Sequence, residues 1–318
     1  MSTHTGAYRP ELLATAGSLA ELERLIDAGA DAFVLGEPRY AMRLPGAFDP
    51  QAMADACRLA HARGVRIYAA VNNLIDNKAA DALDAYISGV ARAGVDAIVF
   101  GDPAVLVQAK AQAPQLALHW SAEMTSTNYA TADFWGRRGA TRVVAARELN
   151  MEELLELKRK SALQVEVQVH GMTNIYHSKR SLLSSYADYR SRAGHGAAQL
   201  ETGSERGLYL IEPERPEERF PIYEDAGGTH IMSADDICLL ECLDELLEGG
   251  IDSFKIDGLL HSEAYNEAVV RAYRTAIDAY CADPAAYRFD ESLLDGIRAL
   301  QDPGRELSFG FMFKEQVY

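Results

Sequence analysis

The sequence is poor in the residues that disulfide-rich and zinc-binding proteins depend on. Its 318 residues include four cysteines, Cys57, Cys238, Cys242 and Cys281. Cys238 and Cys242 lie four positions apart on an expected helix, where they would share one face. No other cysteine and no obvious histidine pair completes a metal-ligand set around them. We interpret the cysteines as free thiols, those two packed in a helix interface, in a reducing compartment.

Long apolar runs and secretion signals are also lacking. No stretch approaches the ~20 consecutive apolar residues that a membrane-spanning helix needs. The first residues, MSTHTGAYRPELLATAG, do not combine a basic start with an apolar core. Both observations predict a cytoplasmic protein that does not span a membrane.

Positive charge is scarce. Lysine and arginine number 31 against 47 aspartate and glutamate, which gives a net charge of −16. A protein that binds nucleic acid tightly on its own normally displays a basic face. The charge balance therefore argues against DNA binding and favours a small substrate, or RNA contact made together with a partner; a local basic patch remains open.

Several catalytic and nucleotide-binding motifs are missing. The first expected strand is followed by Ala14-Thr-Ala-Gly-Ser, which does not match the G-x-G-x-x-G of dinucleotide-binding folds. The sequence also has no P-loop, no H-E-x-x-H and no G-x-S-x-G nucleophile elbow. These absences disfavour a Rossmann dehydrogenase, a P-loop NTPase, a zincin and an α/β-hydrolase.

What the sequence does contain is a repeated unit of helix end, glycine and apolar strand. The unit is visible in DAGADAFVLGE, ARGVRIYAAVN and RAGVDAIVFGD. Strands that alternate with helices through short links predict parallel βα units. Eight strands are expected, at residues 11–16, 31–36, 65–72, 95–101, 116–121, 141–146, 165–169 and 253–256. Eight units favour an α/β fold of the (β/α)8 TIM-like barrel type over a doubly wound sheet.

One segment, residues 181–233, interrupts the alternation between the seventh strand and its expected helix at 234–248. It contains a polar loop at 191–207 and a β-hairpin that pairs 208–212 with 220–224. Long insertions of this kind are often lids or binding elements. We therefore expect a single barrel domain over 1–318 with an insertion at 181–233, and an aromatic tail at 307–318 packed on the barrel.

In such barrels the functional side chains lie at the carboxyl ends of the strands. Arginine and amide groups gather there, and they suit a planar anion such as a carboxylate. The candidate substrate-binding residues are Arg39, Arg43, Asn72, Arg147, His177, Lys179, Arg180 and Lys255. The candidate catalytic residues are His170, Glu123 and Glu148. His170 suits a general base, and a ring that hydrogen-bonds a neighbouring strand is equally open. For each acid, an ion pair at the barrel rim is favoured over catalysis.

Five stretches together carry a family resemblance. They are ELLATAGSLAELERLIDAGADAFVLG, LHWSAEMTSTN, VVAARELNMEEL, VQVHGMTNIYHSKRSLLSSY and THIMSADDICLLECLDELLEGGIDSFKIDG. The fourth corresponds to a signature in which His-Gly is followed by Cys, a short spacer, Gly-x-Cys and Leu-Leu-Ser. Through these stretches the chain resembles the peptidase U32 family over nearly its whole length. It is most similar to the short form found beside a longer member in Gram-positive bacteria.

The resemblance implies a role in hydroxylation. Relatives take part in prephenate-dependent 5-hydroxylation of the wobble uridine of tRNA, in 23S rRNA cytidine hydroxylation and in oxygen-independent ubiquinone hydroxylation. Several relatives carry an iron–sulfur cluster on four cysteines. In this sequence Asn174 and Ser181 replace two of those cysteines and only Cys238 matches a ligand, so we expect this chain to bind no metal or cluster. Asp257-Gly-Leu also replaces the usual Glu-Gly-Arg.

Three hypotheses follow from the resemblance. The first is a cluster-less subunit that forms 5-hydroxyuridine in tRNA together with a longer U32 homologue. In it, prephenate is a possible co-substrate and tRNA is contacted through the complex. The second is a collagenase-like peptidase, for which the sequence offers no identifiable nucleophile or metal site. The third is a non-catalytic scaffold subunit.

Overall fold

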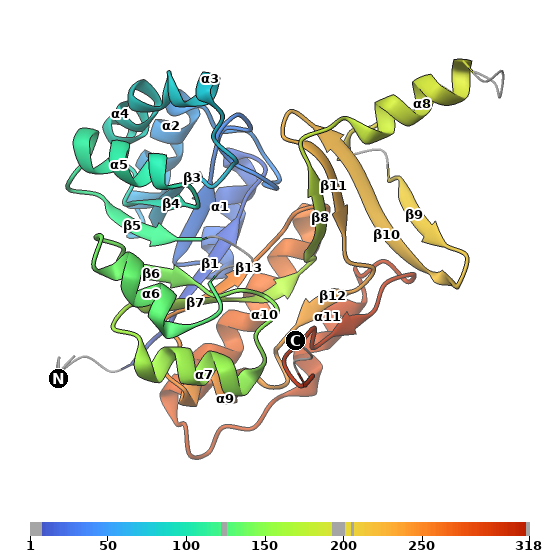
Figure 1. Cartoon of the computed structure of the whole chain (residues 1–318). Helices are drawn as coiled ribbons and strands as arrows, with labels where there is room; N and C mark the ends of the chain where they lie inside the picture. Colours follow the sequence, from blue (N-terminus) through green and yellow to red (C-terminus); the bar gives the residue numbers. More distant parts are fainter. Residues whose placement is uncertain (1–7, 122–125, 193–200, 205–206, 316–318) are drawn as a thin grey trace.

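The fold is a closed parallel barrel. A computed structural model describes residues 8–121, 126–192, 201–204 and 207–315. The barrel strands are β1 (Glu11–Thr15), β2 (Ala32–Leu35), β3 (Arg66–Val71), β4 (Ala97–Phe100), β5 (Ala117–Trp120), β6 (Arg142–Val144), β7 (Gln164–Gly171) and β13 (Ser253–Ile256). β13 pairs in parallel with both β1 and β7, which closes the ring. The predicted (β/α)8 TIM-like barrel is confirmed, and each predicted strand is present (Figure 1).

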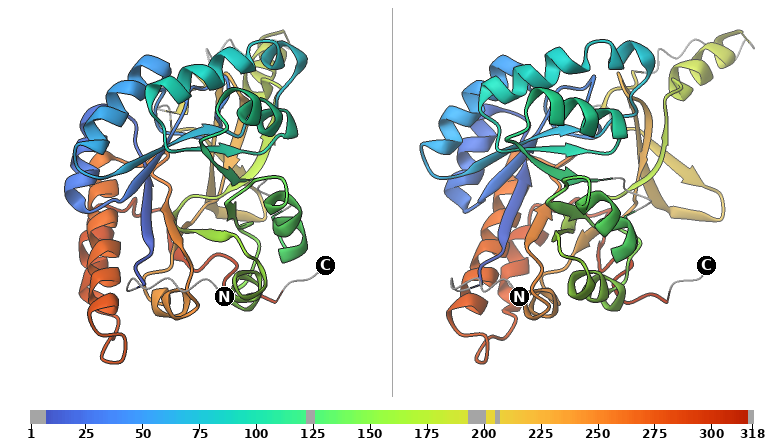
Figure 2. Two further views of the ribbon diagram at one scale, coloured as in Figure 1. Left: turned by 90° about the vertical axis from the view of Figure 1, so that its left-hand side faces the viewer. Right: turned by 60° about the vertical axis from the view of Figure 1, so that its left-hand side comes forward.

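Helices follow the strands and cover the outside of the barrel (Figures 1 and 2). They are α1 (Leu19–Ala28), α2 (Pro50–His61), α3 (Asn77–Ala80), α4 (Leu83–Ala93), α5 (Pro103–Gln112), α6 (Tyr129–Gly136), α7 (Met151–Lys160) and α10 (Glu263–Ala282). Local chemistry sets their ends. The Ser18 hydroxyl oxygen accepts a hydrogen bond from the Glu21 amide at the start of α1. Gly29 ends that helix in the left-handed conformation, with a φ of 110°. None of the described helices combines the length and apolar character needed to cross a bilayer.

The inserted segment forms a second, antiparallel sheet beside the barrel. Its order is β8 (Asn174–Ser178), β11 (Gly228–Met232), β10 (Arg215–Asp225) and β9 (Tyr209–Glu212). The expected hairpin segments correspond to β9 and the second half of β10, where Phe220 lies opposite Leu210. The loop expected from 191 begins inside α8 (Leu182–Arg192), and its residues 193–200 and 205–206 lie outside the described part of the chain. The sequence pattern did not predict β8, β11 or α8.

The helix expected at 234–248 is wrong in its first half. Residues Asp236–Cys238 form β12, which pairs antiparallel with the end of β7, and only α9 (Leu243–Glu248) is helical. The Tyr273 hydroxyl accepts a hydrogen bond from the Leu239 amide at 2.9 Å and donates one to the Val169 carbonyl at 2.6 Å. These two bonds hold the extended segment against β7. Cys238 and Cys242 therefore do not share a helical face.

The tail is held to β12 rather than by its aromatic rings. β14 (Leu307–Ser308) pairs with β12, next to η2 (Glu291–Leu294) and α11 (Asp295–Arg298) in the C-terminal part of the chain. Met312 is buried, whereas Phe309, Phe311 and Phe313 remain substantially exposed. The expected packing of the tail is thus carried by the strand pair and Met312, and residues 316–318 lie outside the described chain.

A buried ion-pair network lies inside the barrel near the amino ends of the strands. Arg142 Nη1 on β6 donates to Glu11 Oε1 on β1 at 2.6 Å and to Glu166 Oε2 on β7 at 3.2 Å. Tyr68 donates to the other Glu11 oxygen at 2.5 Å. Burial pushes the pKa of Glu11 up, but Arg142, Arg66 and Tyr68 outweigh it and hold that pKa below its usual value. The network joins four strands of the barrel, β1, β3, β6 and β7.

Replacing Arg142 is expected to destabilise the barrel strongly. Arg142→Ala leaves two buried carboxyl groups without their guanidinium, a loss that typically costs ~3–5 kcal/mol. Urea unfolding at neutral pH measures the change. The matched control is Arg58→Ala, on the exposed face of α2. Arg58 pairs with Asp55 at the surface, so this substitution should lower the free energy of unfolding by about 0.5 kcal/mol or less. Equal effects of the two substitutions would contradict a structural role for the network.

Candidate functional site

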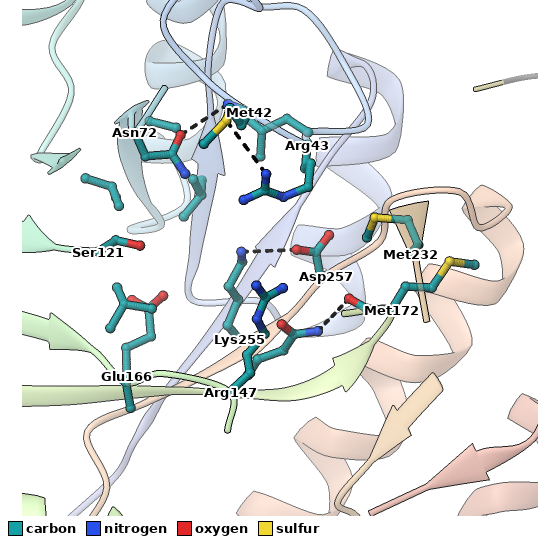
Figure 3. A pocket seen from close by; sticks show the side chains of 17 residues that line it. Met42, Arg43, Asn72, Ser121, Arg147, Glu166, Met172, Met232, Lys255 and Asp257 are labelled. Atoms are coloured by element: carbon teal, nitrogen blue, oxygen red, sulfur yellow. Dashed lines mark hydrogen bonds and ion pairs between the residues drawn. The ribbon is translucent and has the colours of Figure 1, made fainter. Parts of the chain in front are cut away.

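A polar pocket opens at the carboxyl ends of the barrel strands (Figure 3). Its inner part, with a volume of about 70 Å³, lies over the lumen and includes Arg43, Asn72, Arg147, Glu166 and Lys255 in its wall. Asn72, Arg43 and Arg147 also line an outer hollow of about 550 Å³. The inner and outer hollows therefore form one continuous mouth, and the outer volume falls within the ~300–1,000 Å³ of small-molecule sites.

Three cationic side chains converge on this mouth. Arg43 follows β2, Arg147 follows β6, and Lys255 belongs to β13, so three separate strand ends supply them. Burial, with some contribution from Arg147, lowers the pKa of Arg43 to about 10. Burial also lowers the pKa of Arg147, against the opposing effect of Glu148 and Asp257. Two guanidinium groups brought together out of water favour a bound anion, because an anion offsets both their repulsion and their desolvation.

The backbone at Arg43 is unusual. Its φ of 54° lies in the left-handed region, which costs a non-glycine residue about 1–3 kcal/mol. Neighbouring contacts hold the loop in place: the Asn72 side-chain oxygen accepts the Met42 amide at 3.2 Å, and the Phe48 amide donates to the Gly36 carbonyl at 2.9 Å. The loop is therefore fixed with Arg43 directed over the barrel, as Figure 3 shows.

Acids and amides complete the inner wall. Lys255 Nζ lies 3.2 Å from Asp257 Oδ2, and Gln168 donates to the Met172 carbonyl at 3.0 Å. Glu166 points from β7 toward the same space (Figure 3), and burial raises its pKa. A proton on Glu166 would make it a hydrogen-bond donor toward a bound anion. The mouth thus offers cations, an amide and a carboxyl group of raised pKa at one place.

The structure brings together half of the predicted substrate-binding residues. Arg43, Asn72, Arg147 and Lys255 share the inner pocket, and His177 on β8 borders the outer hollow. The other three lie elsewhere. Arg39 and Lys179 line a separate hollow beside Asp76, and the exposed Arg180 precedes α8.

The predicted catalytic residues separate in space. His170 is buried and away from the mouth, with its Nε2 at 2.9 Å from the Tyr265 hydroxyl of α10. The ring of His170 therefore makes a structural hydrogen bond, as in the alternative that we left open, but its partner belongs to a helix rather than to a neighbouring strand. Glu148 lines the outer hollow, where it could still act on a ligand. Glu123 lies outside the described residues.

Sequence reasoning missed several wall residues. Glu166 and Gln168 alternate with Val165 and Val167, so the two-residue period of the strand could have assigned them to the lumen. Met172 and Met232 close the side of the pocket from β7's end and from β11. That meeting depends on the second sheet, and no local pattern in the sequence signals it.

The residues at the family's cysteine positions do not fit an iron–sulfur cluster. Asn174 and Ser181 offer amide and hydroxyl groups rather than thiolates. Cys238 is buried, burial raises its pKa, and its sulfur lies 4.0 Å from the Tyr273 hydroxyl. Within the described ranges no group of three or more histidine, cysteine, aspartate or glutamate side chains is arranged to hold a metal ion.

Comparisons with known proteins identify the family of the chain and support its fold. Residues 17–317 match the model of "Peptidase family U32". The chain is 45% identical over 311 residues to a Bacillus subtilis protein named tRNA hydroxylation protein P2, covering 98% of this chain and 99% of that protein. It is 32% identical to tRNA hydroxylation protein P1 of the same organism, covering 90% of this chain and 67% of that protein. The solved structure of the U32 peptidase Mk0906 has a TM-score of 0.50 at 15% identity, covering 81% of this chain and 96% of that one, and supports the fold.

The environment of His170 predicts a pH effect on stability. Burial lowers its pKa to about 3, against an opposing effect of Asp236. The folded-state pKa is below the unfolded value of ~6.5, so the unfolded chain binds more protons and stability falls as pH drops below ~6.5. Between pH 7 and pH 5 this one residue should account for about 2 kcal/mol of lost stability.

His170→Gln tests that assignment, because glutamine can still hydrogen-bond Tyr265 but does not titrate. Urea unfolding at pH 7 and pH 5 should show a smaller loss for the variant than for the parent chain. Equal losses in the two proteins would mean that His170 is not buried in its neutral form.

Proposed function

The chain belongs to peptidase family U32, and from that membership we propose that it takes part in the hydroxylation of tRNA, as a subunit that forms 5-hydroxyuridine at the wobble position. The observation that carries the proposal is the near-full-length 45% identity to a relative named for tRNA hydroxylation. A mouth lined by the buried Arg43 and the half-buried Arg147 is consistent with it, because the reaction needs a bound co-substrate as well as the RNA base.

The proposed co-substrate is an organic carboxylate such as prephenate. Arg43, Arg147 and Lys255 supply three positive charges to the inner pocket, against Asp257 and Glu166, and two further acids, Asp102 and Glu148, line the outer hollow. Arginine binds carboxylates through paired N–H donors. The outer hollow then leaves space for the uracil ring next to the held anion. In this arrangement the arginines bind and orient the co-substrate, and Glu166 is placed to give or take a proton beside it.

The chain is proposed to work with a longer U32 homologue. In B. subtilis two related proteins carry the names P1 and P2, and the match to P1 leaves about a third of P1 uncovered. The non-cysteine residues at positions 174 and 181 support a division of labour, in which a cysteine-complete partner carries any iron–sulfur cluster. The present chain would contribute the anion pocket.

Neither alternative gains support from the site. A peptidase needs an activated nucleophile, but Cys57, Cys238 and Cys242 are buried with raised pKa values, and His170 is remote from the mouth. A decayed scaffold would have filled its mouth with its own side chains. The outer hollow of about 550 Å³ argues for a ligand-binding role instead.

Disrupting the gene in its own organism is expected to lower 5-hydroxyuridine and its derivatives in bulk tRNA. The physical reason is loss of the anion site from the modifying assembly. Nucleoside mass spectrometry of digested tRNA measures the change, and re-expression of the chain should restore the signal. Unchanged nucleoside profiles in the disrupted strain would refute the proposed function.

Arg147→Ala should fail to restore the modification. Removing a charge-assisted contact of ~1.5–3 kcal/mol predicts a roughly tenfold or greater drop in 5-hydroxyuridine when the variant replaces the parent chain. The melting temperature should change little, because relief of the repulsion between Arg147 and Arg43 offsets the lost attraction to Glu148 and Asp257. Arg58→Ala, on exposed α2, is the matched control and should restore the modification fully. If Arg147→Ala restored 5-hydroxyuridine fully, the proposed role of the anion pocket in the modification would be refuted.

A further inference from the structure

Helix α8 stands away from the rest of the protein (Figures 1 and 2). None of its 11 residues is buried. Its first turn is fastened to the second sheet: the Leu182 amide donates to Thr229 Oγ1 at 2.9 Å, and the Leu183 amide donates to Glu224 Oε2 at 3.0 Å. Beyond that turn, the helix projects outward.

A helix of this length needs more than its own hydrogen bonds. Isolated helices shorter than ~12–15 residues are marginal in water, and most helices in proteins are stabilised by packing one face. A projecting, unpacked helix beside a candidate active site is therefore suited to packing against a binding partner.

The side chains of α8 indicate which partner. Tyr186 and Tyr189 are 54% and 69% exposed, and they share one face with Arg190 by their spacing of three and four residues. The Arg190 guanidinium lies 5.9 Å from the Tyr186 ring centre, with Nη1 at 3.3 Å from the Tyr186 hydroxyl. Exposed aromatic rings stack on unpaired bases, and arginine beside them binds phosphate or stacks as well.

Local charge also favours RNA. Residues 174–192 contain Lys179, Arg180, Arg190 and Arg192 against a single acid, Asp188, so four positive charges less one negative give +3, in a chain whose total is −16. Two further acids face this segment, Asp76 at 3.7 Å from Lys179 and Glu224 at the start of the helix. The Glu224 carboxylate accepts hydrogen bonds from the amides and from the Ser184 hydroxyl, and counting both acids lowers the local charge from +3 to +1, still positive.

The most acidic part of the insertion is distant from α8. It is the turn that contains Glu212, Glu214, Glu217 and Glu218. This turn lies at the Arg215 end of β10, whereas α8 is fastened near Glu224 at the other end. The nearest of these acids, Glu218, is six residues from Glu224 along β10, which at ~3.3 Å per residue separates the two by about 20 Å.

The mouth and α8 are joined by β8. Asn174, Ile175, Tyr176 and His177 line the outer hollow, and the chain runs from there through Lys179 and Arg180 into the helix. At 1.5 Å per residue α8 is about 16 Å long, a span of roughly two or three nucleotides of single-stranded RNA. An RNA base entering the mouth would bring its neighbouring nucleotides alongside the helix.

We propose that α8 binds the single-stranded tRNA nucleotides next to the base that enters the mouth. Tyr186 and Tyr189 stack on the bases, while Arg190 and Arg192 contact the phosphates. This inference rests on the proposed function and adds to it an RNA-binding surface within this chain. It replaces the expectation that tRNA is reached only through the complex.

Fluorescence anisotropy with an unmodified anticodon stem-loop transcript tests the surface. Tyr186→Ala/Tyr189→Ala in the full chain should weaken binding roughly tenfold or more. Arg190→Gln/Arg192→Gln should weaken binding and lower the slope of log Kd against log salt by roughly 1 to 2. Tyr129→Ala and Arg58→Ala, exposed on α6 and α2, are the matched controls and should bind as the parent does. Both test pairs should keep the parent melting temperature, because α8 contributes nothing to the core.

Each other outcome overturns the inference. Failure of the parent chain to bind the transcript, or parent-like binding by both α8 variants, removes α8 as an RNA surface. Parent-like RNA binding combined with loss of a co-purifying U32 chain would make α8 a protein-docking element instead. These results are distinguishable from failure of the proposed function, which is measured by 5-hydroxyuridine in the gene-disrupted strain and does not depend on binding by the variants.

Discussion

The contact of Arg142 with Glu11 and Glu166 is the interaction on which the barrel interior depends. A guanidinium held between two carboxyl groups from other strands fills the lumen where most TIM barrels place apolar layers. Breaking such a group from one side leaves buried charge uncompensated, so the three strands tolerate little relative movement. Glu166 belongs both to this network and to the wall of the pocket. The position of the pocket floor is therefore set by the same ion pairs that join the strands.

The two ends of the lumen differ in charge. Near the amino ends, Glu11 and Glu166 are matched by Arg142 and Arg66. In the inner pocket, Arg43, Arg147 and Lys255 outnumber the two acids of its wall, Glu166 and Asp257, whereas Asp102 and Glu148 line the outer hollow. In a chain with a net charge of −16, a cationic recess with low-dielectric walls concentrates its field on one small volume. Small anions are therefore attracted to that recess more than to the acidic remainder of the surface.

Local patterns in the sequence were sufficient for the barrel and for the ring of strand-end cations. The recurring glycine followed by an apolar strand predicts each βα unit, and every strand end projects its next polar residue at the same face. The same pattern placed His170 wrongly, at the mouth, because the pairing of β7 with β13 is irregular. Lys255 lies opposite Gln168, but the next residue of β13, Ile256, lies opposite His170, so β7 has one extra residue at this point. An extra residue in one strand turns the following side chain to the other face. His170 is thus directed toward α10, and a two-residue count along the strand could not have shown it.

The sequence pattern also failed to predict elements that form only by pairing with distant segments of the chain. Residues 236–238, Asp-Ile-Cys, lie in the stretch that we expected to be helical, yet the end of β7 pairs with them and they form β12. In the same way β8 forms only because β11 returns beside it, placing Tyr176 opposite Ile231. Such pairings join segments more than 50 residues apart, beyond the reach of any local period.

The second sheet is what relates the mouth to α8. Met172, Tyr223, Met232 and Leu259 form a buried apolar cluster that fastens this sheet to the barrel. Tyr223 stacks on His230 at 4.8 Å, and His230 stacks on His177 at 4.7 Å, so a continuous row of rings runs across the sheet to the edge of the outer hollow. A shift of the sheet would disturb this row and the wall of the mouth together. The segment that contains Asn174 and Ser181 thus builds one side of the pocket and sets where the basic helix emerges.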